Sequence, residues 1–227
     1  VHPQCLKNTD SRTDTMASDN TLRVEDVARY ITVRVASENT WGSGILVCEQ
    51  DGTYIVATSQ HLLSTGTSFN IETVDSRNHT AHVLDSSIRS LYDVGFLSFT
   101  EAENNYSTAQ VDPDSDSVMD SNVYASGFPL DLESGRSDRL LVTEGEVEMV
   151  LTQPLFSGYQ IGYTNSITQG MSGGPLLNRR GEVVGINGLR RFPLWGNPYV
   201  HQDGTEVSDA DEETLRQLAW AIPISTV

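Results

Sequence analysis

Cysteine is scarce in this chain of 227 residues, which contains only Cys5 and Cys48. Two cysteines are too few for a small disulfide-rich scaffold, and no CxxC pair provides the spacing of a structural metal site. The two thiols either pair, which would suit an oxidising compartment, or are unrelated. Both alternatives stay open at this point.

Basic residues are also few: 14 Lys and Arg stand against 31 Asp and Glu, a formal net charge of −17 at pH 7. Because phosphate backbones repel such a surface, we expect no nucleic-acid partner. No apolar run approaches the roughly 20 residues of a transmembrane helix, so we expect no membrane span. Repeats and heptads are missing too. With 37% hydrophobic residues, the composition predicts a soluble globular protein.

The beginning of the chain lacks an initiating Met and the charged-then-apolar pattern of a secretion signal, since it reads Val1-His2-Pro3-Gln4. Residues 1–20 are polar and rich in Asn, Asp, Ser and Thr, which is typical of a tail with little to bury. We interpret this start as that of a processed product and expect a periplasmic or secreted protein.

Short apolar runs with a period of two fill most of the remaining sequence and predict β-strands. Two helices are expected, near 21–31 and at 208–219, and Asp51-Gly52 predicts a tight hairpin. About twelve strands at this spacing favour a β-sandwich or β-barrel over βαβ units. The acidic stretch 101–120 is interpreted as a linker between two halves. The runs lie at 31–35, 44–47, 54–57, 69–74, 81–84, 94–99, 121–125, 140–142, 147–151, 159–163, 182–186 and 220–224.

Three local patterns carry side chains suited to catalysis. His61 follows an apolar strand, Asp93 opens another, and Ser172 lies in the run Gly170-Met171-Ser172-Gly173-Gly174. Glycines on both sides of the serine let the backbone turn sharply, so that the amides of Gly170 and Ser172 can form an oxyanion hole for a reacting carbonyl. An ordinary Gly-rich turn is the alternative for this motif taken alone.

Together the three patterns favour a catalytic triad. They occur in the order His61, Asp93, Ser172, with gaps of 32 and 79 residues. A serine hydroxyl is a poor nucleophile near neutral pH unless a base removes its proton, and the base needs a carboxylate to hold its tautomer. An α/β-hydrolase is disfavoured, because that family runs in the order Ser, acid, His.

Further segments, together with these three motifs, match one family of proteins in the same order along the chain. They lie at 42–46, 93–97, 170–178, 181–187 and 221–224. With them the sequence resembles the chymotrypsin-fold, trypsin-like serine proteases, in the style of the bacterial HtrA-like group. Residues 158–224 are also similar to trypsin-like peptidases of cyanobacteria.

This resemblance implies an all-β fold of two six-stranded antiparallel β-barrels, about 30–110 and 118–227, within a peptidase domain covering 21–227. The active site would lie between the barrels, with the His and Asp from the first and the Ser from the second, and short helices near both ends of the chain. It implies a serine endopeptidase that acts on protein or peptide substrates through an acyl-enzyme, without cofactor or metal.

The resemblance also implies a substrate pocket. Its base is expected six residues before the nucleophile, at Ser166, and a serine there cannot select Lys or Arg by charge pairing. We therefore expect a neutral or apolar residue on the amino side of the cleaved bond. The expected walls are Asn187, Gly188, Leu189 and Ala219, the last in place of a common glycine.

Two departures from the family bear on function. Digestive trypsins carry an Asp directly before the nucleophile for zymogen activation, whereas this chain has Met171, so activation by that ion pair is not expected. Residues 190–217 form an insertion that either caps the cleft or is a solvated loop with a helix. Its residues Asp203, Asp209 and Asp211 lack the spacing of a calcium loop, and no metal is expected there.

A catalytically silent peptide-binding module of the same fold is the alternative function.

Overall fold

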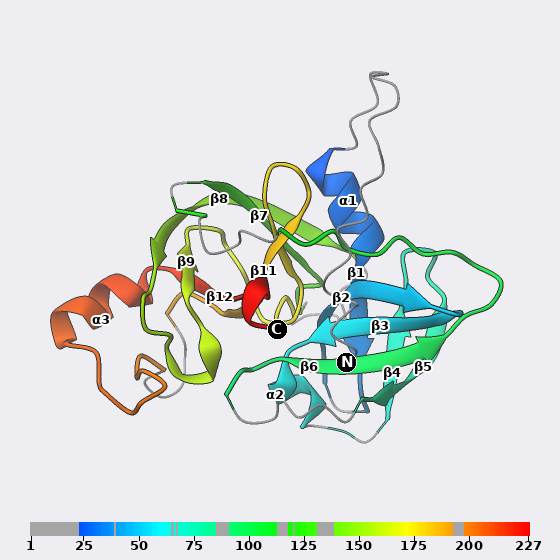
Figure 1. Ribbon diagram of the computed structural model, residues 1–227, viewed down its shortest axis with the longest axis horizontal. Helices are drawn as coiled ribbons and strands as arrows, with labels where there is room; N and C mark the ends of the chain where they lie inside the picture. The colour runs from blue at the N-terminus through cyan, green and yellow to red at the C-terminus, as the bar shows by residue number, and fades with distance from the viewer. Residues whose placement is uncertain are drawn as a thin grey trace.

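Two closed barrels of six antiparallel strands lie side by side, with helix α3 at the outer end of the second barrel (Figure 1). The computed structural model describes residues 23–38, 40–64, 66, 68–84, 91–112, 118–119, 121–130, 139–192 and 198–227. The predicted tail at 1–20, including Cys5, lies outside this part of the chain. The predicted all-β, two-barrel fold is confirmed.

The first barrel closes in the strand order β1-β2-β3-β6-β5-β4. Its interior is apolar because alternate strand residues point inward, among them Val33, Leu46 and Leu97. The predicted hairpin is confirmed: Asp51 and Gly52 have φ of 51° and 76°, as a tight two-residue turn requires. The strands are β1 (Thr32–Ala36), β2 (Trp41–Gln50), β3 (Thr53–Thr58), β4 (Phe69–Glu72), β5 (Asn78–Val83) and β6 (Gly95–Thr100).

The second barrel closes in the order β10-β11-β12-β9-β8-β7 around its own apolar core. β8 is one continuous strand where the sequence pattern showed two runs, because polar residues 143–146 between them stay paired with β7. Tyr124, for example, donates to Glu144 across this pair at 3.2 Å. The strands are β7 (Asn122–Gly127), β8 (Leu141–Val150), β9 (Ile161–Tyr163), β10 (Pro175–Leu177), β11 (Val183–Leu189) and β12 (Ala219–Pro223).

Two short helices were predicted and are present, α1 (Val24–Ile31) and α3 (Asp209–Arg216). The second ends before the expected residue 219, because Ala219 already pairs in β12. The 3₁₀ turns η2 (Phe156–Gly158) and η3 (Ile224–Thr226) were not predicted. Ser208 caps α3 by accepting a hydrogen bond from the amide of Asp211. A further helix, α2 (Gln60–Leu63), directly follows β3 and was not predicted, since four residues carry no readable apolar period. In the described part of the chain, no helix has the length and apolarity to cross a membrane.

The barrels are held against each other by a shared apolar cluster and by the chain between them. The cluster joins Ala57 and Phe96 of the first barrel to Leu177 and Ile186 of the second. The connection after β6 is fixed on both sides rather than free, because the Ala109 amide donates to Leu46 and the Asp112 amide to Val183, at 2.7 and 3.0 Å. Residues 113–117 and 120 of the predicted linker lie outside the described residues.

Candidate active site

Pairing of β3 with β6 brings His61 and Asp93 together. Thr58, the last residue of β3, lies opposite Gly95, the first of β6. His61 therefore begins just beyond one strand end while Asp93 precedes the neighbouring strand. The Nδ1 atom of His61 lies 2.6 Å from Oδ2 of Asp93, and the backbone amide of His61 donates to Oδ1 at 2.7 Å. Both carboxylate oxygens thus orient the same histidine.

The Asp93 carboxylate is buried and receives a further donor. Its side chain is 10% exposed, whereas that of His61 is 57% exposed. The hydroxyl of Tyr159 donates to Oδ2 of Asp93 at 2.7 Å, and the amide of Asp93 donates to the carbonyl of Ser157 at 2.8 Å. The hydrogen bond with Asp93 raises the pKa of His61 above 6.5, against the opposite effect of its partial burial. Asp93 therefore favours the imidazolium form.

Ser172 lies in a sharp turn just before β10, flanked by glycines with positive φ. Gly170 and Gly173 have φ of 95° and 86°. The amides of the other turn residues are used within the protein: Met171 donates to Thr168 at 3.1 Å and Gly173 to Asn187 at 2.7 Å. Within the described residues, the amides of Gly170 and Ser172 donate to no backbone carbonyl. These two amides are therefore the donors left for an incoming oxygen atom.

The serine turn is anchored on both barrels. Met171 is fully buried in the core of the second barrel. Ser43 of β2 reaches across from the first barrel: its amide donates to the carbonyl of Ser172 at 2.9 Å, and its hydroxyl donates to the carbonyl of Gly170 at 2.8 Å. The sequence alone assigned no role to Ser43, because Gly170 and Ser172 lie more than a hundred residues away in the chain.

The serine turn lies beside the end of β3, just before helix α2, which carries His61, at the contact between the barrels. A Cβ added to Gly173 would stand 2.6 Å from Oγ1 of Thr58 and 2.8 Å from the amide nitrogen of Ser59. In the described part of the chain, the hydroxyl of Ser172 donates to the carbonyl of Gly188, at 3.1 Å, and to no side chain. The hydroxyl of Ser172 is thus bound to the protein's own backbone.

The expected pocket residues differ in their surroundings. Ser166 is exposed, and Leu189 is half-buried. Asn187 is fully buried, and its side chain is turned into the second barrel, where it accepts from the hydroxyl of Tyr163 at 2.9 Å and donates to two carbonyls. Ala219 is buried in the same core. The backbone of Asn187 is also used within the protein, since its amide donates to Gly174 and its carbonyl accepts from Gly173. Asn187 therefore supports the serine turn.

Part of the 190–217 insertion packs on the loop that holds Asp93. The amide of Phe156 donates to the carbonyl of Val200 at 2.6 Å, and the side-chain amide of Gln202 donates to the carbonyl of Leu91 at 2.8 Å. The described part of the insertion is thus fixed at this edge and is more than a solvated loop. Residues 193–197 lie outside the described residues.

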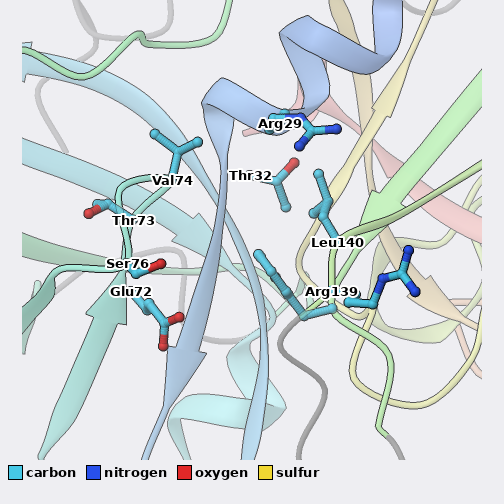
Figure 2. Close-up of a pocket in the computed structure, with 9 residues that line it drawn as sticks. Arg29, Thr32, Glu72, Thr73, Val74, Ser76, Arg139 and Leu140 are labelled. Atoms are coloured by element: carbon cyan, nitrogen blue, oxygen red, sulfur yellow. The ribbon is translucent and has the colours of Figure 1, made fainter.

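Two polar regions lie apart from these residues. A cavity of about 300 Å³ opens between α1 and the β4–β5 turn, with Arg29 and Arg139 on one side and Val74 and Ser76 on the other (Figure 2). It contains none of the predicted site residues.

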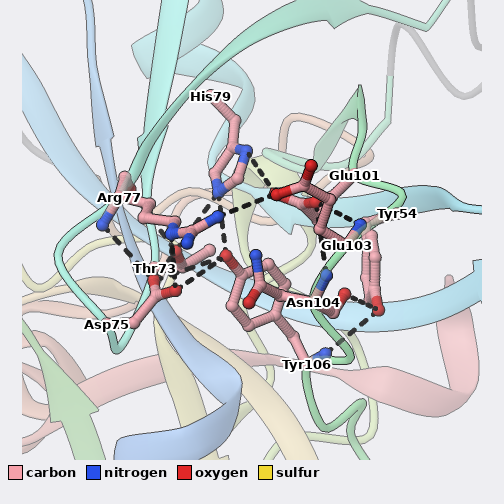
Figure 3. A network of polar contacts seen from close by, with 9 residues as sticks. All are labelled: Tyr54, Thr73, Asp75, Arg77, His79, Glu101, Glu103, Asn104 and Tyr106. Carbon is pink, nitrogen blue, oxygen red and sulfur yellow. Dashed lines mark hydrogen bonds and ion pairs between the residues drawn. The ribbon is translucent and has the colours of Figure 1, made fainter.

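A polar network at the far end of the first barrel connects His79, Asp75, Glu101 and Tyr106 (Figure 3). His79 also stacks on Phe99, with ring centroids 4.5 Å apart. Among the described residues, no group of three or more His, Cys, Asp or Glu side chains is arranged to hold a metal ion.

The two-barrel fold is that of the chymotrypsin-like serine peptidases. The family described as trypsin-like peptidase domain matches residues 42–186. The Serine protease Do-like HtrA of Bacillus subtilis is 28% identical over 162 residues, covering 68% of this chain and 34% of that protein. The Periplasmic serine endoprotease DegP of Escherichia coli K12 is 30% identical over 159 residues, covering 69% of this chain and 31% of that protein.

The chain belongs to the trypsin-like peptidase family. It spans about a third of the length of the curated relatives it matches.

Proposed function

We propose that this chain is a serine endopeptidase in which Ser172 is the nucleophile, His61 the general base and acid, and Asp93 the carboxylate that orients the base. The observation that carries the proposal is the pair of hydrogen bonds from His61 to Asp93 beside the glycine-flanked serine turn. Asp93 binds Nδ1 of His61, which leaves Nε2 as the atom that can take a proton from Ser172.

The reaction proceeds in two halves. His61 removes the hydroxyl proton as Ser172 attacks the peptide carbonyl, and the same proton passes to the departing amine as the carbon–nitrogen bond breaks. Water then attacks the acyl-enzyme, with His61 again taking a proton and returning it to the serine oxygen. The side chain of His61 is more than half exposed, so a substrate can reach the imidazole in both halves of the reaction.

The amides of Gly170 and Ser172 are proposed to bind the oxyanion in each half. They donate to no other group among the described residues, so no internal hydrogen bond must break when the substrate oxygen arrives. Loss of one such donor typically lowers the rate about 10²- to 10³-fold.

A catalytically silent peptide-binding module is the second candidate. The hydrogen bond from the Ser172 hydroxyl to the carbonyl of Gly188 favours it, because that hydroxyl donates away from His61. A peptidase needs that hydroxyl to face His61, whereas the histidine and the carboxylate are already joined. The peptidase is therefore the function better supported.

The test compares the parent chain with Ser172→Ala and with Ser107→Ala, a control at an exposed serine on the connection between the barrels. A fluorophosphonate probe and a fluorogenic protein substrate are expected to report activity in the parent and in Ser107→Ala. Ser172→Ala should keep the parent's circular dichroism spectrum and lose both signals. Labelling or hydrolysis that survives in Ser172→Ala would remove Ser172 from its role.

Substrate class and location follow the same proposal. We propose protein or peptide substrates with a neutral or apolar residue before the cleaved bond, because no carboxylate stands at position 166. Cleavage confined to sites after Lys or Arg in a peptide library would contradict this preference. The disulfide-bonded state of Cys48 and the word periplasmic in the name of one relative support a periplasmic or secreted location. Its pairing with Cys5 stays a prediction.

A further inference from the structure

Tyr159 connects the second barrel to the carboxylate of the first. It lies between η2 and β9, and its hydroxyl donates to Oδ2 of Asp93 at 2.7 Å. That oxygen is the same one that faces Nδ1 of His61. The Asp93 oxygen that orients the imidazole is therefore shared with a phenol from the other barrel.

The phenol reaches Asp93 only because residue 188 has no side chain. A Cβ added to Gly188 would overlap the hydroxyl oxygen and Cε1 of Tyr159, and it would stand 2.7 Å from Cζ. Gly188 is not in a conformation with positive φ, so backbone strain does not demand glycine there. The space occupied by the Tyr159 ring does.

Tyr159 is well fixed in this position. Its ring belongs to the apolar cluster shared by the barrels, and its carbonyl accepts from the amide of Leu155 at 2.9 Å. Burial, and then the nearby negative charge of Asp93, raise the pKa of the phenol well above 10. The hydroxyl therefore keeps its proton over the working range of a peptidase and always acts as a donor.

We propose that Tyr159 is a positioning residue for the triad and that Gly188 is bare in order to admit it, an inference that rests on the proposed function. Gly188 then affects both Asp93 and Ser172. Its missing side chain leaves room for the phenol that binds Asp93, and its carbonyl accepts a hydrogen bond from the hydroxyl of Ser172. Correct placement of the base thus depends on the second barrel being docked.

The surroundings of Asp93 make the effect of the phenol specific. Among the described residues, the titratable groups bonded to its carboxylate are His61 and Tyr159, and the amide of His61 donates to the same carboxylate. The backbone amide of Asp93 donates to the carbonyl of Ser157. Removal of the phenol hydroxyl leaves more negative charge facing His61 and one fewer bond fixing the carboxylate. We expect a higher pKa of His61 and a slower chemical step.

The first experiment uses Tyr159→Phe, which removes one oxygen and keeps the ring. We expect kcat to fall about tenfold to a hundredfold, the range of a hydrogen bond to a charged group, with KM little changed. NMR titration of His61 in the Ser172→Ala background should show a pKa above that of the same background with Tyr159 intact. An unchanged kcat together with an unchanged pKa of His61 would overturn the proposal.

The second experiment moves the hydroxyl to residue 188. Tyr159→Ala opens the space, and adding Gly188→Ser returns a hydroxyl on a Cβ that overlaps the former position of the phenol oxygen. The matched control adds Gly188→Ala, which restores the Cβ without the hydroxyl. We expect the serine double variant to recover at least tenfold more kcat than the alanine one, at similar melting temperatures. Equal recovery by both would mean that the ring only fills space, and the proposal would fail.

The readouts separate this inference from the proposed function. The pKa of His61 is measured without turnover, so it tests Tyr159 even if the parent chain hydrolyses nothing. Absence of probe labelling in the parent would reject the peptidase, whereas a normal parent with an insensitive Tyr159→Phe would reject only the role of Tyr159.

Discussion

Met171 should stabilise both the second barrel and the serine turn, and truncating it to alanine tests this. Its side chain is 0% exposed and packs in the core of the second barrel, directly between the two residues whose amides face the proposed oxyanion. The neighbouring strand leaves no slack, because a Cβ added to Gly127 would lie 2.7 Å from Cα of Met171. Met171 thus stands where digestive trypsins use a buried ion pair, and it holds the turn by apolar burial.

Removal of a fully buried Met side chain costs about 2–5 kcal/mol, the sum of lost transfer free energy and the cavity left behind. Met171→Leu conserves the volume and should cost less than about 1.5 kcal/mol. If the turn also loosens, either amide donor can move out of position, and the rate should fall up to about 10²- to 10³-fold. Met171→Ala should therefore lose both stability and kcat, while Met171→Leu keeps most of both.

The assay is equilibrium unfolding in urea, carried out in the Ser172→Ala background so that self-cleavage does not interfere, together with kcat/KM in the active background. An unfolding free energy of Met171→Ala within about 1 kcal/mol of the parent would refute the role of Met171 as a core anchor. Equal losses of activity in Met171→Leu and Met171→Ala would refute the argument from volume.

Two further predictions follow from the site. Because Asp93 raises the pKa of His61 above 6.5, the acidic limb of kcat/KM should lie above pH 6.5. By the same sign, the stabilising contribution of protonated His61 is fully present below the unfolded pKa and is lost as pH rises through the folded value. Asp93→Asn should move the NMR titration of His61 to lower pH, since burial then acts alone. Gly173→Ala should reduce kcat/KM at least 10²-fold, because its Cβ would stand 2.6 Å from Oγ1 of Thr58 at a φ of 86°. Gly204→Ala, at the same φ with nothing within 4 Å, is the control and should lower only the melting temperature, slightly.

Features fixed by short-range pattern could be predicted from the sequence. The short apolar runs identified the strands apart from β10, and Asp51-Gly52 identified a hairpin whose two positive φ values any such turn requires. The motifs around His61, Asp93 and Ser172 belong to the same group, because strand ends and flanking glycines mark them locally. The expected wall Asn187 shows the limit: its position on β11 was readable, but the direction and partners of its side chain depend on Tyr163 and on two distant carbonyls.

Contacts between the barrels were beyond the sequence, and they have a common form. The turn that carries Ser172 belongs to the second barrel, yet Ser43 of the first barrel binds it. Asp93 belongs to the first barrel, yet Tyr159 from the second barrel binds it. Each barrel thus binds a proposed catalytic segment of the other barrel through one polar side chain. The sequence around that side chain does not mark it, because a lone Ser or Tyr among strands is typical of an ordinary surface or core position. Both contacts form only when the barrels dock. The first barrel alone would therefore leave Asp93 without Tyr159, and the second barrel alone would leave the serine turn without Ser43. The peptidase proposed here is therefore a property of the docked pair.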